Sequence, residues 1–235
     1  QVARADPDTV SGDNVVDLDW RPGGAELAMG MSSRVKVIAA PDYREVAAYS
    51  AGNGWHVAAW SPAGDRIAVA SATHLALWER GGQKPLWKVA LRDKPFESNA
   101  SQIAWEPGGE RISYSSPGIP LSLYSAREGS HLRQWKTLGE YHTWHPRGGQ
   151  LAFQSSDRRV TVTDADSGET LEDRAGWKSG HGLTSLAWHP NGNILATARE
   201  GDFMIELWEM PGGKNIAQFS GGSSRIFSLA WSPDG

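Results

Sequence analysis

The stretch that decides the fold is "FSLAWSPDG" (227–235), because nearly the same phrase occurs earlier as "SLAWHPNG" (185–192) and "VAAWSPAG" (57–64). Aligned on its tryptophan, the phrase occurs six times, with successive spacings of 40, 45, 39, 44 and 43 residues. Self-similarity at such a period is the sequence signature of a repeat architecture. A proline stands two residues after each tryptophan, and a glycine four residues after it. The six tryptophans are Trp20, Trp60, Trp105, Trp144, Trp188 and Trp231.

The repeated pattern W-x-P-x-G predicts a tight turn between two strands. Proline presets φ for the second position of such a turn, and glycine is favoured at its fourth. In the five complete copies a large aliphatic residue follows seven positions after the tryptophan, and a small residue comes next. The small slot, eight positions after the tryptophan, predicts a second strand packed closely on a neighbour; it holds Ala28, Ala68, Ser113, Ala152 and Ala196.

Two further strands complete each repeat. Alternation with period two predicts a third strand, as in "VKVI" (35–38) and "IELW" (205–208). A fourth segment, such as "ETLEDRAG" (169–176), is more polar, which a strand at the edge of a sheet tolerates. In the first strand, most of the residues five and two positions before the tryptophan are apolar, an offset that predicts a β-bulge. Each repeat is therefore predicted to be one four-stranded antiparallel sheet.

Composition excludes several kinds of site. The chain has 235 residues, of which 39% are apolar, and its net charge of −4 comes from mixed signs without a basic block. This balance gives no electrostatic reason to expect nucleic acid or an anionic membrane as a partner. The absence of cysteine excludes disulfides, thiolate metal sites and a cysteine nucleophile.

The fifth copy, "GHGLTSLAWHPNGNILATAREGDFMIELWEM" (180–210), resembles the WD40-repeat family of β-propellers. A Gly-His pair opens it, and an aspartate stands six residues before the closing tryptophan. The resemblance implies a buried hydrogen-bonded network of His181, Thr197, Asp202 and Trp208, which would rigidify this blade. The fourth copy keeps only the aspartate of this network, Asp157. TolB-like and peptidase propellers carry similar turn phrases, but the "GH…D…LWE" order favours WD40.

The resemblance implies an all-β, single β-propeller domain over residues 1–235, built from four-stranded antiparallel blades. About five complete repeats are expected, with partial blade strands at both termini. The chain starts at Gln1 and stops within the repeated phrase, so we expect a fragment of a longer propeller. Such an open arc would self-associate or pair with the missing blades. The repeats are expected at approximately 15–51, 52–95, 96–138, 139–179 and 180–222, with a partial one at 223–235.

The residues that could suggest a metal, catalytic or phosphate-binding site are better explained by structural roles within the repeat. His142 and His145 in "HTWH" are spaced like a metal pair, but His145 shares its slot after the repeat tryptophan with other polar residues. We therefore expect His145 in an exposed turn and His142 as a hydrogen-bonded strand histidine. No nucleophile is expected beside His181 and Asp202, and the glycine-rich turns open strands instead of the helix that a phosphate cradle needs. No catalytic residue, metal or cofactor is predicted.

These motifs build blades, which favours a non-catalytic module for protein–protein interaction. The resemblance implies a protein or peptide partner on one propeller face. Trp177 lies outside the repeat slots, and a partner anchor and packing between blades both explain it. The rim of the partner face would include His56, Ser101, Glu140, Ser156, Thr184, Gly201 and Phe227.

The degenerate, tryptophan-rich repeats resemble bacterial WD40 arrays, which implies a scaffold or sensor in a larger signalling or defence protein of the cytoplasm. The main alternative is an accessory propeller that docks or gates substrate for a catalytic domain outside this chain. A third alternative is that the central channel of the propeller binds a small ligand.

Overall fold

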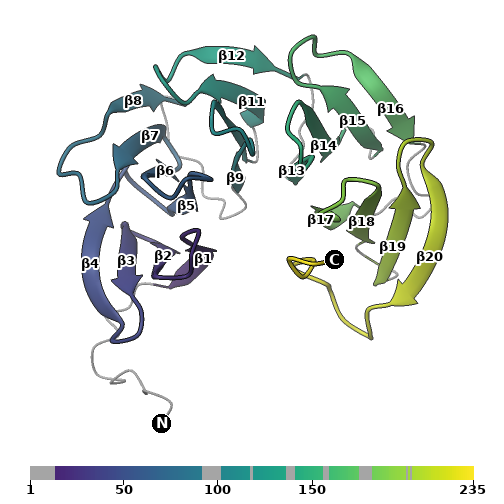
Figure 1. Ribbon diagram of the computed structural model, residues 1–235, viewed down its shortest axis with the longest axis horizontal. Helices are drawn as coiled ribbons and strands as arrows, with labels where there is room; N and C mark the ends of the chain where they lie inside the picture. The colour runs from purple at the N-terminus through teal and green to yellow at the C-terminus, as the bar shows by residue number, and fades with distance from the viewer. Residues whose placement is uncertain are drawn as a thin grey trace. The chain divides into compact units, whose positions relative to one another are not determined.

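The computed structural model describes residues 14–91, 102–116, 119–135, 141–155, 159–174, 182–199, 201 and 203–235. All regular structure in these ranges is β-strand, arranged as five separate four-stranded antiparallel sheets (Figure 1). No helix in the described part of the chain is long and apolar enough to cross a membrane. The chain divides after Asn99 into two compact units, and each unit is described by itself.

The first unit contains two blades, each a meander in which every strand pairs with the next in sequence. Blade 1 consists of β1 (Val15–Trp20), β2 (Glu26–Met31), β3 (Val35–Ala39) and β4 (Arg44–Tyr49). Blade 2 consists of β5 (Val57–Trp60), β6 (Arg66–Ala70), β7 (His74–Glu79) and β8 (Trp87–Ala90).

The second unit contains three blades with the same meander order. Blade 3 consists of β9 (Gln102–Trp105), β10 (Arg111–Ser116), β11 (Ile119–Ser125) and β12 (His131–Gln134). Blade 4 consists of β13 (His142–Trp144), β14 (Gln150–Gln154), β15 (Val160–Asp164) and β16 (Thr170–Arg174). Blade 5 consists of β17 (Leu183–Trp188), β18 (Ile194–Arg199), β19 (Met204–Glu209) and β20 (Lys214–Ser220).

All six W-x-P-x-G segments form the predicted turn. In each, the glycine N–H donates to the carbonyl of the residue that follows the tryptophan, at 2.8–3.0 Å. The six glycines have φ between +70° and +96°, a conformation that side chains with a Cβ rarely adopt. The glycine of the pattern is therefore required by the backbone as well as by turn preference.

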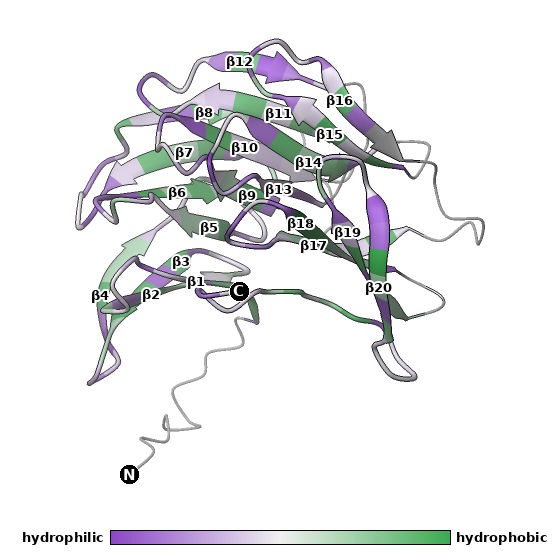
Figure 2. Ribbon diagram, turned by 45° about the vertical axis from the view of Figure 1, so that its right-hand side comes forward, coloured by the Kyte–Doolittle hydropathy of each residue, from purple (hydrophilic) through white to green (hydrophobic). Residues whose placement is uncertain are grey.

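The predicted bulge is present in two of the five first strands. The register shifts between Val15 and Asp17 in β1 and between Leu183 and Ser185 in β17. The described pairings of β5, β9 and β13 with the following strand have no such shift. The fourth strands lie at the edges of their sheets. Figure 2 shows the contrast in hydropathy between β12, which is mostly hydrophilic, and β6, which is mostly hydrophobic.

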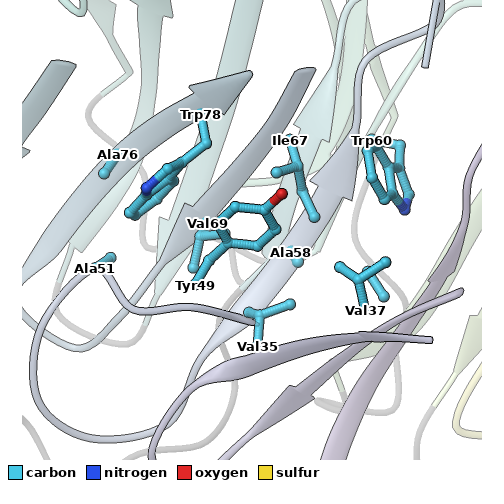
Figure 3. Close-up of a cluster of buried hydrophobic side chains, with 11 residues drawn as sticks. Val35, Val37, Tyr49, Ala51, Ala58, Trp60, Ile67, Val69, Ala76 and Trp78 are labelled. Atoms are coloured by element: carbon cyan, nitrogen blue, oxygen red, sulfur yellow. The ribbon is translucent and has the colours of Figure 1, made fainter. Parts of the chain in front are cut away.

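The core consists of apolar clusters that join neighbouring blades of one unit. In the first unit, Val35 and Val37 of β3 pack with Trp60 of β5 and Ile67 of β6 (Figure 3). The small slot of the second strand belongs to these clusters: Ala28 lies in the cluster of Trp60, and Ala152 in that of Trp188. The small residue thus makes space for the repeat tryptophan of the next blade.

The C-terminal end of the chain differs from expectation. Residues 1–10, predicted to supply an edge strand, lie outside the described residues. Residues 225–231, predicted as the first strand of a sixth repeat, form no strand, because no ladder partner lies beside them in the described structure. Their position is nevertheless that of the repeat, since the Leu229 N–H donates to Ser185 Oγ at 3.0 Å and Trp231 Nε1 donates to the Ala187 carbonyl at 3.0 Å.

The small slot predicts a matched pair of stability changes. Ser113 Oγ accepts a hydrogen bond from Trp144 Nε1 at 2.9 Å, whereas Trp188 Nε1, which faces a blade with Ala152 in this slot, is buried without a partner among the described residues. We expect Ser113→Ala to lower the free energy of unfolding by about 2 kcal/mol, because it leaves a buried donor unpaired. We expect Ala152→Ser to raise it by about 1 kcal/mol by supplying an acceptor.

Urea unfolding followed by tryptophan fluorescence measures both changes. A loss of stability in Ala152→Ser as large as that in Ser113→Ala would show that the two slots do not face their tryptophans in the same way.

Candidate functional site

Two of the predicted rim residues are buried, which corrects their assignment to a partner face. His56 is 0% exposed and Thr184 is 1% exposed. The preceding blade covers His56, whose backbone N–H donates to the Met31 carbonyl at 2.9 Å and whose Nε2 lies 3.3 Å from Ser50 Oγ. Burial lowers the pKa of His56 and favours its neutral form. Neither side chain is accessible to a partner.

The remaining rim residues divide into two groups. Phe227 is 78% exposed, and the Arg225 guanidinium carbon lies 5.6 Å from the centre of its ring. Gly201 is also exposed. Ser101, Glu140, Ser156 and Trp177 lie outside the described residues, so their place on a partner face stays a prediction.

Half of the predicted WD40 network is visible. Trp208 Nε1 of β19 donates to Thr197 Oγ1 of β18 at 3.0 Å, so the structure brings these two members together. Asp157, His181 and Asp202 lie outside the described residues, and the four-membered network stays a prediction.

The two histidines of "HTWH" each find partners within the blades. His142 is buried, with Nε2 at 2.8 Å from Ser113 Oγ and Nδ1 at 3.0 Å from Ser115 Oγ. This agrees with the expected hydrogen-bonded strand histidine. Among the described residues, no group of three or more metal-ligating side chains comes together.

His145 was expected in an exposed turn, and this was wrong. It is buried, its ring lies edge-on at 4.9 Å from the ring of Trp188, and Nε2 lies 3.2 Å from the Gly192 carbonyl. Gly192 is the turn glycine of the next blade. The slot after the repeat tryptophan is therefore a contact between blades.

The same contact recurs with different chemistry. Arg21 Nε donates to the carbonyl of turn glycine Gly64 at 2.7 Å. Glu106 Oε1 accepts the Gly149 N–H at 3.0 Å. His189 lies edge-on at 4.6 Å from the ring of Trp231. Sequence reasoning missed this role because the slot varies in residue type, although it is polar in every copy.

A second contact joins the innermost strands. The acceptor is a polar side chain three positions before the repeat tryptophan of one blade, and the donor is the backbone N–H two positions before the repeat tryptophan of the next blade. Asp17 Oδ2 accepts the Ala58 N–H at 2.8 Å, and Gln102 Oε1 accepts the His142 N–H at 2.8 Å. The bond from Leu229 to Ser185 is the third example. Asp19 adds a bond from Trp60 N at 2.7 Å. Burial, together with the nearby Asp17 carboxylate, raises the pKa of Asp19 to about 6 despite that bond.

Comparison with known proteins agrees with this architecture. The family model described as WD domain, G-beta repeat matches residues 176–209. Pre-mRNA-processing factor 19 of Bos taurus is 26% identical over 141 residues, which is 59% of this chain and 28% of that protein. Human Coronin-7 is 39% identical over 54 residues, 23% of this chain and 6% of that protein. The chain thus matches less than a third of the length of these relatives.

A solved structure extends the likeness to nearly the whole chain. A chain in the structure titled "Crystal Structure of Mitotic Checkpoint Complex" superimposes with a TM-score of 0.83 at 14% identity, over 97% of this chain and 71% of that chain. The five sheets are the four-stranded blades of a β-propeller fold, as predicted. The family match and the relatives confirm that the resemblance is to WD40-repeat proteins.

The buried His142 predicts an acid-sensitive fold. Burial lowers the pKa of His142 to about 3, whereas an unfolded histidine titrates near its ordinary value of 6.5. As the pH falls, the unfolded state therefore becomes protonated at His142 before the folded state does. The contribution of the neutral, buried His142 to the free energy of unfolding is lost as the pH falls from about 6.5 towards 3. The slope is about 1.4 kcal/mol per pH unit.

We expect His142→Gln to remove this slope while its amide keeps a donor and an acceptor for Ser113 and Ser115. Unfolding free energies measured at several pH values between 7 and 4.5 give the difference between the two proteins. A constant difference over this range would contradict a neutral, buried His142.

The contact of His145 with Gly192 predicts a second effect. A Cβ at Gly192, whose φ is +78°, would collide with the His145 ring, whereas one at Gly212, with φ of +103°, meets no atom within 4 Å. Gly212→Ala should cost about 1–2 kcal/mol from backbone strain alone. Gly192→Ala should cost about 1–2 kcal/mol more, because the buried ring must move.

In a His145→Ala background the excess cost of Gly192→Ala should disappear. Thermal or urea unfolding of the unsubstituted chain, Gly192→Ala, His145→Ala and the double variant completes the double-mutant cycle. Equal costs with and without His145 would exclude the proposed clash.

Proposed function

We propose that this chain is a non-catalytic interaction module that binds a protein or peptide partner within a larger assembly in the cytoplasm. The observation that carries the proposal is the likeness of its fifth repeat to the WD40 family, supported by the shared fold of a chain in a structure titled as a complex. Nucleic acid is not the proposed partner, because the net charge is −4 and the signs are mixed.

The described polar residues support this function by what they contact. His142, His145, Thr197 and Trp208 each hold one strand or blade to another. Glu106 and Arg111 pair with each other at 2.6 Å, and Arg111 also reaches Asp166 of the next blade at 2.5 Å. These groups build a rigid frame, which is what an interaction scaffold needs to present its surface.

Phe227 is the exposed residue that best fits a contact with a partner. It is a large aromatic side chain in open solvent, next to an arginine, and these are residue types enriched at the energetic centres of interfaces. We place the partner face around Phe227 and Gly201. His56 and Thr184 are left out of it because they are buried.

The test uses two exposed phenylalanines. The tagged chain is cross-linked and purified from the cells that encode it, and bound proteins are quantified by mass spectrometry. Binding of the recovered partner should weaken roughly 30-fold in Phe227→Ala, which corresponds to about 2 kcal/mol at an interface anchor. It should persist in Phe219→Ala, which removes a 51% exposed phenylalanine from the edge strand β20.

Two outcomes would count against the proposal. If no protein is enriched over the tag alone, the interaction function is rejected. If Phe219→Ala weakens binding as much as Phe227→Ala, the partner face is wrongly placed.

A further inference from the structure

Grooves recur where two neighbouring blades of one unit meet. One of about 440 Å³ lies between the outer strand of blade 1 and the turn after Trp78. Two others lie at equivalent positions of the repeat and can be compared directly. The first, between blades 1 and 2, has a volume of about 180 Å³ and is lined by residues that include Glu26, Val37, Trp60 and Arg80. The second, between blades 4 and 5, has a volume of about 420 Å³ and is lined by residues that include Gln150, Val162, Glu172, Trp188 and Met210. We call them the closed groove and the open groove.

The two grooves are built from equivalent positions of the repeat. Glu26 and Gln150 each stand six residues after a repeat tryptophan, and Trp60 and Trp188 are the repeat tryptophans of the following blades. Arg80 and Met210 each stand two residues after the closing tryptophan of the third strand, Trp78 or Trp208. The two grooves therefore differ in the chemistry of the residues that occupy these positions.

An arginine lines the closed groove and pairs with its buried acid. Arg80 Nη2 lies 2.6 Å from Glu26 Oε1, and Arg80 Nε lies 3.0 Å from Glu26 Oε2, a two-pronged pair that spans the two blades. Glu26 is almost completely buried beneath it. The hydrogen bond from Arg80 holds the pKa of Glu26 below its usual value.

An arginine also occupies the junction between blades 3 and 4. The Arg111 guanidinium carbon lies 5.5 Å from the ring centre of Trp144, the repeat tryptophan of blade 4, at a distance suited to a cation–π contact. Arg111 stands six residues after Trp105, the position that Glu26 has after Trp20. Its partner Asp166 lies in the turn after the third strand of blade 4, which is equivalent to the turn of blade 2 that contains Arg80. The charges are exchanged, but a guanidinium again lies between the blades.

The open groove has neither charge at these two positions. Gln150 replaces the acid of the closed groove, and Met210 replaces the arginine. What remains is an apolar lining of Trp188, Met210, Val162 and Leu171, with the carboxylate of Glu172 at the groove, where it accepts the Gly212 N–H at 2.7 Å. Arg147 lines the groove from the exposed turn of blade 4.

We propose that the open groove between blades 4 and 5 binds an arginine side chain of a partner protein. The apolar walls suit the methylene stem, Trp188 offers its ring, and the Glu172 carboxylate can accept the guanidinium. The partner thus supplies from outside what Arg80 and Arg111 supply from within at the other junctions. This inference rests on the proposed function in one respect, which is that the chain binds a protein partner and that this partner supplies the arginine.

The test titrates the full 235-residue chain with N-acetyl-L-arginine methylamide and follows the indole N–H signals of the tryptophans by NMR. The Trp188 signal is assigned with Trp188→Phe, and Trp144 serves as an internal reference. A single side chain in such a groove should bind with a Kd of about 1–10 mM. The norleucine analogue, which has the stem without the guanidinium, should bind at least 5-fold more weakly.

Glu172→Gln should weaken arginine binding at least 5-fold while the Trp144 signal stays in place. The double variant Gln150→Glu/Met210→Arg transplants the closing pair of blade 1 and blade 2 into this groove and should abolish binding. The reciprocal variant Glu26→Gln/Arg80→Met should open the closed groove and create a new response at the Trp60 signal.

Several outcomes would overturn the inference. Absence of a shift at Trp188 at 50 mM ligand, roughly five times the upper Kd, would exclude arginine binding. Tighter binding of the N-acetyl-L-glutamate analogue would assign the groove to an anion held by Arg147. Unchanged binding in Gln150→Glu/Met210→Arg, with the Trp144 signal intact, would place the ligand elsewhere. None of these results bears on partner capture through Phe227, so the two proposals fail separately.

Discussion

The structure depends on satisfying the backbone of the innermost strands. The first strand of each blade lies at a sheet edge, and in blades that follow another blade of the same unit this strand is buried against its neighbour. A buried N–H without a partner is costly, and in the described part of the chain no further strand of the same sheet lies there to accept it. Asp17 and Gln102 supply the acceptors from the preceding blade, so that the edge of one sheet is completed by side chains of another.

Much of the architecture follows from the repeated phrase. The six turns, the small slot, the polar edge strand and the bulge were all predictable, because each reflects a local rule of backbone or side-chain size. The contacts between blades were less accessible to prediction. His145 and Glu106 share a slot with Arg21, and only their common polarity points to a shared role.

The candidate site was predicted less well than the fold. Resemblance placed Thr197 and Trp208 together, since their contact lies within one blade and follows from strand register. His56 and Thr184 were misplaced because their exposure depends on the neighbouring blade, which strand pattern alone does not describe. Phe227 occupies the same slot and is exposed, so that position in the repeat does not determine accessibility.

The turn glycine has a consequence for how such a chain can evolve. Arg21 needs a carbonyl from the turn of the next blade, whereas Glu106 needs an N–H, and it obtains one from Gly149, which directly follows turn glycine Gly148. Both groups are backbone atoms that every turn of the complete repeats has, since the residue after the turn glycine is never proline. The position after the tryptophan can therefore change between donor and acceptor side chains in evolution while the backbone partner in the next blade stays in place.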